Sequence, residues 1–138
     1  MHSNNNPIQT NSLPDGIHYL LEFFGCNQEQ SNSIKFWEQL ISQALLNTDL
    51  QVLNSHFYQF TPNGITGYFL ISASHISIHT WPEHRYLACD IFSCSNESQT
   101  ETIVNHLRDS FAYDHVKVTK LRRGFKYNGD SDELEKDI

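Results

Sequence analysis

The chain has 138 residues, which is enough for one globular domain and too few for two. Of these residues 38% are hydrophobic and 12% aromatic, a composition that suits a globular domain. Its formal net charge of −7 leaves no basic face to dominate, which argues against a nucleic-acid partner. No apolar run approaches the roughly 18 residues that span a membrane, and the first residues lack the charged and apolar regions of a signal peptide, so no membrane partner is expected.

The first third of the chain predicts a leader, a strand and a helix. Residues 1–15 are polar, rich in asparagine and broken by prolines, which is typical of a flexible leader. Aromatic and aliphatic density rises over residues 16–26, which indicates a buried strand. Ser31 or Ser33 is a candidate N-cap for a helix that runs to about residue 47, because the apolar residues that follow keep helical spacing.

The rest of the chain is dominated by predicted strands. Residues 51–60 have the composition of a strand, and the Thr-Pro-Asn-Gly sequence at residues 61–64 predicts a turn after it. The remaining expected elements are strands at 65–72, 75–80, 85–94 and 115–121, a helix near 97–111, and an acidic tail over 128–138.

This order of elements predicts a single α+β domain over residues 16–127. We expect a two-layer α/β sandwich, in which a largely antiparallel sheet carries both helices on one face. The other face of the sheet must then be covered, lined with polar groups or used for dimerisation.

The cysteines indicate a reducing environment. Cys26, Cys89 and Cys94 cannot all pair within one chain, and their spacing matches neither a disulfide framework nor a CxxC zinc site. A cytoplasmic location is therefore expected.

The strand predicted at residues 75–80 has histidines on one side. In strand geometry His75, Ser77 and His79 share a face, while Ile76 and Ile78 point into the core. The two histidines would then lie ~13 Å apart at ~3.3 Å per residue, too far for one metal ion, so no metal site is expected.

The sequence of residues 74–83, Ser-His-Ile-Ser-Ile-His-Thr-Trp-Pro-Glu, resembles the signature of the prokaryotic S-adenosylmethionine decarboxylase family. The resemblance covers about residues 16–124. Three further segments carry it, namely residues 16–23, similar to the family's first strand, residues 57–67, similar to the hairpin before the cleavage site, and residues 90–94, similar to the strand with the catalytic cysteine.

The resemblance implies a self-cleaving, pyruvoyl-dependent decarboxylase. Ser74 would attack the carbonyl of Ala73, and the cut would convert Ser74 into a covalent pyruvoyl group at the start of the second chain. That ketone would form a Schiff base with the substrate's amine and withdraw electrons as the carboxylate leaves. The implied substrate is S-adenosylmethionine, whose decarboxylation supplies aminopropyl groups for polyamine (spermidine) synthesis.

The resemblance also implies roles for five other side chains. His79 would transfer a proton during self-cleavage, and Thr66 would support processing in place of the serine that is common there. Cys94 would return a proton to the substrate carbon, Phe60 would stack on the adenine, and Glu83 would hold the ribose hydroxyls. Subunits of this family pair and share active-site residues across the interface, so a homodimer of cleaved protomers is expected.

Residue 73 leaves two alternatives open, because the family usually has glutamate where this chain has Ala73. One is a pyruvoyl-dependent ornithine or arginine decarboxylase, against which Phe60 and Glu83 argue, since a substrate without adenosine needs neither. The other is an uncleaved regulatory paralogue, against which the retained serine, histidine and cysteine argue.

Overall fold

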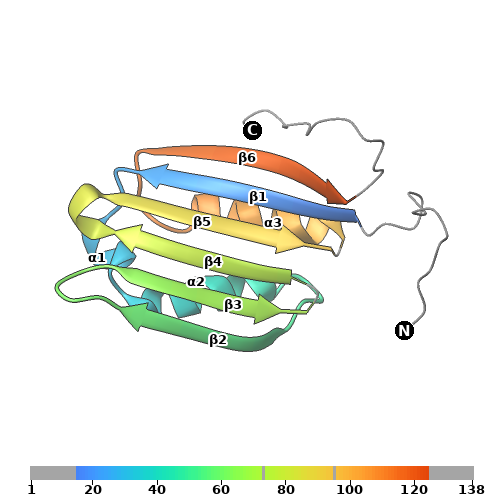
Figure 1. The fold of residues 1–138 in the computed structure, drawn as a ribbon, viewed down its shortest axis with the longest axis horizontal. Helices are drawn as coiled ribbons and strands as arrows, with labels where there is room; N and C mark the ends of the chain where they lie inside the picture. The colour runs from blue at the N-terminus through green and yellow to red at the C-terminus, as the bar shows by residue number, and fades with distance from the viewer. Residues whose placement is uncertain (1–14, 73, 95, 125–138) are drawn as a thin grey trace, which may run out of the picture.

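The computed structural model describes residues 15–72, 74–94 and 96–124, which form one sheet with three α-helices on one side (Figure 1). The elements in chain order are β1 (Asp15–Phe24), α1 (Gln28–Ser31), α2 (Ile34–Leu45), β2 (Val52–Gln59), β3 (Ile65–Ile71), β4 (Ser74–Trp81), the 3-10 turn η2 (Pro82–His84), β5 (Tyr86–Ser93), α3 (Glu97–Asp109) and β6 (His115–Gly124). Ala73, the predicted tail and all of the predicted leader except Asp15 lie outside the described residues.

The sheet has six strands in the order β2-β3-β4-β5-β1-β6, and every neighbouring pair is antiparallel. The predicted α+β sandwich with an antiparallel sheet is therefore confirmed. β4 lies between β3 and β5, so that Ser74 at its start is opposite Ile71 on one side and Ser93 on the other.

The helices begin where short polar side chains satisfy their first backbone N–H groups. The Ser33 hydroxyl accepts a hydrogen bond from the backbone N of Phe36, 3.1 Å away, at the start of α2. The Asn96 side chain accepts one from Ser98 at the start of α3. The sequence analysis missed α1 and η2, since helices of four and three residues are too short to show an apolar stripe. No helix in the described part of the chain is both long and apolar enough to cross a membrane.

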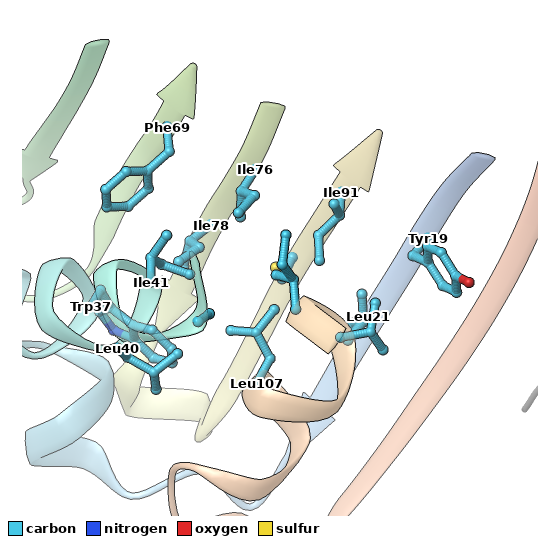
Figure 2. Packing of buried hydrophobic residues seen from close by; sticks show 14 of the residues in the cluster. Tyr19, Leu21, Trp37, Leu40, Ile41, Phe69, Ile76, Ile78, Ile91 and Leu107 are labelled. Atoms are coloured by element: carbon cyan, nitrogen blue, oxygen red, sulfur yellow. The ribbon is translucent and has the colours of Figure 1, made fainter. Parts of the chain in front are cut away.

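The core lies between the helices and one face of the sheet (Figure 2). Trp37 and Ile41 from α2 are fully buried there, as are Ile76 and Ile78 from β4. Other labelled members of the cluster are Tyr19, Leu21, Leu40, Phe69, Ile91 and Leu107.

The opposite side of the sheet, called the open face below, carries His75, Ser77 and His79 and is covered by no helix among the described residues. This arrangement confirms the predicted alternation along residues 75–80. Large apolar side chains remain exposed there, each at 37% or more, namely Leu20, Phe24, Tyr58, Tyr68, Leu70 and Trp81. A face with this much exposed apolar surface is typical of an interaction surface.

Candidate active site

Ser74, the predicted nucleophile, opens β4 with its side chain on the helix-covered side of the sheet. The residue is 9% exposed, and its hydroxyl oxygen has no hydrogen-bond partner in the described structure. Buried hydroxyls are usually paired, because leaving one unpaired costs about 1–3 kcal/mol. The Ser74 hydroxyl therefore serves no structural hydrogen bond in the described structure, which is compatible with its predicted role as a nucleophile.

Cys94 lies at the same end of the sheet as Ser74. It directly follows Ser93, which is the register partner of Ser74 on β5. Cys94 is exposed, whereas Cys26 and Cys89 are buried, and all of these thiols are free. Burial raises the pKa of Cys26 to about 11 and raises the pKa of Cys89 further, which leaves both thiols protonated and inert. Among the described cysteines, Cys94 alone is accessible to a substrate.

Thr66 and His79 form a pair on the open face. They are register partners on β3 and β4, and Thr66 Oγ1 lies 3.1 Å from His79 Nδ1. The His79 ring also lies against the Trp81 ring, with 6.3 Å between centroids. With Nδ1 engaged, Nε2 is the nitrogen left for proton transfer.

Phe60 and Glu83 lie at the same end of the sheet as this pair. The Phe60 backbone N donates to the carbonyl of Gly64, just before β3 begins, and its ring is 46% exposed. Glu83 is an exposed residue of η2, directly after β4. Two hydrogen bonds hold the η2 turn in place. Gln28 Nε2 donates to the Pro82 carbonyl, and Arg85 Nε donates to the Cys26 carbonyl, each with a donor–acceptor distance of 3.1 Å.

The predicted site residues therefore form two groups at opposite ends of β4. We call the end with Ser74 and Cys94 the cleavage end, and the end with Phe60, Thr66, His79 and Glu83 the processing end. Five positions of strand separate Ser74 from His79, which corresponds to about 16 Å, and the two side chains point to opposite faces. One protomer does not bring His79 to Ser74, so the expected role of His79 in cleavage stays a prediction that requires a second protomer.

Sequence analysis missed a polar network in the middle of the open face. The Asp90 carboxylate on β5 receives contacts from His18 Nε2 at 2.6 Å and His75 Nε2 at 3.1 Å, both on Oδ2, while the Ser77 hydroxyl donates to Oδ1. Arg123 Nη1 lies 3.4 Å from His18 Nδ1. Because a guanidinium can only donate, this contact places the proton of a neutral His18 on Nε2, facing Asp90. The sequence did contain a signal for this network, because polar residues alternate with apolar ones on the predicted strands that carry it.

His18, His75 and Asp90 also offer ligand atoms within 4.8 Å of one another, a grouping that the comparison of His75 with His79 did not reveal. Two imidazoles and a carboxylate can bind transition metals. A metal would need Nε2 of both histidines without a proton, whereas the Arg123 contact favours a protonated Nε2 on His18. Hydrogen bonding therefore accounts for the cluster as it stands.

The network keeps Asp90 ionised. Partial burial of its carboxylate raises the pKa, but the hydrogen bonds from Ser77, His18 and His75 outweigh this effect, and the net result is a lowered pKa.

Comparison with known proteins decides the family. The family model described as S-adenosylmethionine decarboxylase matches residues 17–124. The chain belongs to the S-adenosylmethionine decarboxylase family. Figure 1 shows that nearly all of the sheet and all of the helices lie within the matched range.

Relatives in the family match over most of their length. The S-adenosylmethionine decarboxylase proenzyme of Thermococcus gammatolerans is 30% identical over 116 residues, which is 84% of this chain and 81% of the relative. The proenzyme of Clostridium botulinum (strain Langeland) is 33% identical over 109 residues, which is 79% of this chain and 94% of the relative. The crystal structure of the adenosylmethionine decarboxylase from Aquifex aeolicus superimposes with a TM-score of 0.75 and 28% identity, covering 87% of this chain and 98% of that one.

Replacing Asp90→Asn should lower the free energy of unfolding by about 1–3 kcal/mol at pH 7, because three donors lose an ionised acceptor. The folded-state pKa lies below the unfolded one, so this stabilisation is present above the ordinary aspartate pKa of about 3.9 and is lost as pH falls through the folded-state value. Urea unfolding across this range should show the difference shrinking in acid. The exposed Asp109→Asn serves as the control, and a loss that is independent of pH would contradict the assignment.

Proposed function

We propose that this chain is a pyruvoyl-dependent S-adenosylmethionine decarboxylase, a carboxy-lyase that cleaves itself between Ala73 and Ser74. The observation that carries the proposal is the buried, unpartnered Ser74 hydroxyl at the start of a paired strand, with the exposed Cys94 beside it. The product would be the aminopropyl donor of polyamine synthesis. Free cysteines suit the reducing cytoplasm that we propose as its location.

The bonds that change in self-cleavage all belong to the backbone and the Ser74 side chain, while His79 would transfer protons. Ser74 Oγ attacks the carbonyl carbon of residue 73, and the peptide C–N bond breaks as an ester forms and the Ser74 amine is freed. Removal of the Ser74 Cα proton then expels the carboxylate of residue 73 and leaves a dehydroalanine. The dehydroalanine is an enamine, and its imine tautomer reacts with one water, which releases ammonia and leaves the ketone. The step uses only the carbonyl of residue 73, so alanine supports it.

The ketone supplies an electron sink for the bonding electrons that the substrate's carboxylate leaves behind. In this proposal the Cys94 thiol gives a proton to the substrate carbon after carbon dioxide departs. The exposed Phe60 ring stacks on the adenine, and the exposed Glu83 carboxylate accepts hydrogen bonds from the ribose hydroxyls.

The working unit that we propose is a homodimer joined through the two open faces. Two observations support it. The open face exposes large apolar side chains, including Leu20 on β1 and Tyr68 on β3. The site residues also lie at opposite ends of one sheet, so an antiparallel pairing of two sheets would bring the cleavage end of one protomer to the processing end of its partner. Thr66 and His79 would then lie at the partner's cleavage end and would transfer protons there.

Ser74→Ala should abolish cleavage and leave a single chain of 16.0 kDa, whereas the wild type separates into two fragments in intact-mass measurements. Stability should be unchanged or slightly higher, because the deleted hydroxyl has no partner to lose. Ser55→Ala on the edge strand β2 is the matched control and should cleave normally. A wild-type chain that never splits would overturn the proposal in favour of an uncleaved regulatory paralogue.

Cys94→Ala should still cleave but lose turnover by roughly 10²–10⁴-fold, the usual contribution of a positioned proton donor. Carbon dioxide release should be measured with S-adenosylmethionine, ornithine and arginine as separate substrates. Cys26→Ala, which removes a buried thiol, should keep its turnover. Turnover at the wild-type rate in Cys94→Ala would refute the role assigned to Cys94. Release of carbon dioxide from ornithine or arginine, but not from S-adenosylmethionine, would show that the substrate is a basic amino acid.

Leu20→Glu should convert the dimer into monomers, because it places a charge among the exposed apolar side chains of the open face. The monomer should also fail to cleave, since no partner would supply His79 to the cleavage end. Light scattering after gel filtration measures the first effect, and intact mass measures the second. Leu46→Glu, at a leucine that is 79% exposed after α2, is the control that should remain dimeric. Cleavage by a monomeric Leu20→Glu chain would disprove the shared site.

A further inference from the structure

His75, the first residue after the cleavage serine, is attached to the neighbouring strand by its side chain. Its Nε2 lies 3.1 Å from Asp90 Oδ2, and its ring lies against Phe92 with 6.1 Å between centroids. Phe92 is the register partner of His75 on β5, and Asp90 lies two residues earlier on the same face. The start of β4 is therefore tied to β5 by side-chain contacts in addition to the backbone ladder.

Asp90 is itself fixed in place from two other directions. His18 on β1 contacts the same carboxylate oxygen at 2.6 Å, and Ser77 on β4 donates to the other oxygen. His18 in turn lies 3.4 Å from Arg123 Nη1 on β6. The carboxylate side chain is 23% exposed, so water competes little for it. Asp90, the residue that His75 contacts, is therefore supported by contacts from β1 and β6, which lie beyond β5 in the strand order.

Such a tie matters more after the cut than before it. In the intact chain, β4 is joined covalently through residue 73 to the segment that follows β3. A cut before Ser74 turns the first residue of β4 into a chain end, and chain ends fray unless something holds them. The Ser74 hydroxyl has no hydrogen-bond partner in the intact chain and is lost in the cut, so it cannot resist fraying. His75 carries the first side-chain hydrogen bond along β4 in the described structure.

We propose that Asp90 is a positioning residue which, through His75, holds the new end of β4 in the sheet after self-cleavage. The inference rests on the proposed cut before Ser74. By keeping this end opposite Ser93, the tie keeps the group derived from Ser74 beside Cys94 during turnover. The tie adds little while the chain is intact, because the covalent connection already confines the strand.

Hydrogen exchange of the amides in residues 75–81 tests this inference. His75→Ala should be compared in the cleaved protein and in the uncleavable Ser74→Ala background. Loss of the tie should speed exchange at the start of β4 by about tenfold or more in the cleaved protein, the equivalent of one hydrogen bond to a charged group. In the intact background the change should be much smaller. His75→Gln, which keeps an amide donor, should restore part of the protection and of the turnover.

His18→Ala is the matched control. It removes the other donor to the same Asp90 oxygen from an uncut strand, so it should lower global stability while leaving exchange at the start of β4 close to the wild-type rate. The inference would be overturned if His75→Ala accelerated amide exchange at the start of β4 equally in the cleaved and uncleavable backgrounds. It would also be overturned if His75→Ala and His18→Ala accelerated that exchange equally, or if His75→Ala failed to cleave. An intact wild-type chain would instead show that the proposed function itself fails, and the inference with it.

Discussion

The placement of β4 between β3 and β5, with alternate side chains buried, is the constraint on which the rest of the structure depends. Ile76 and Ile78 are fully buried on the helix-covered side, so a shift of one residue in register would expose both. The same alternation sends Ser74 inward and His75 and His79 outward. The Thr66–His79 and Asp90–His75 contacts follow from this register and need no separate explanation.

A single sheet of this kind carries the predicted site residues at its two ends and does not bring them together. The rise of a strand separates Ser74 from His79 by about 16 Å, and no rotamer change closes that distance. In the proposed dimer, a second sheet packed antiparallel on the open face would bring the partner's His79 to the cleavage end and would cover the exposed apolar side chains. Association and assembly of the site would then share one physical cause, which is the burial of that face.

The fold also separates reactive groups from inert ones. Cys26 and Cys89 are buried with raised pKa values, whereas Cys94 lies beyond the end of β5 and is exposed. The Asp90 carboxylate is partly buried, but three donors keep it ionised. Chemical reactivity in this chain is therefore set by position along a strand as much as by residue type.

The sequence by itself determined the α+β class, the six strands of the described structure and the two longer helices, because apolar periodicity records which side of each element is buried. It also determined the family and the candidate residues, since the segment from Ser74 to Glu83 is specific. Only the tertiary structure decided that these residues divide between two ends of the sheet, and that Asp90 gathers His18 and His75. Those facts depend on the order and register of strands distant in sequence, which local patterns do not encode.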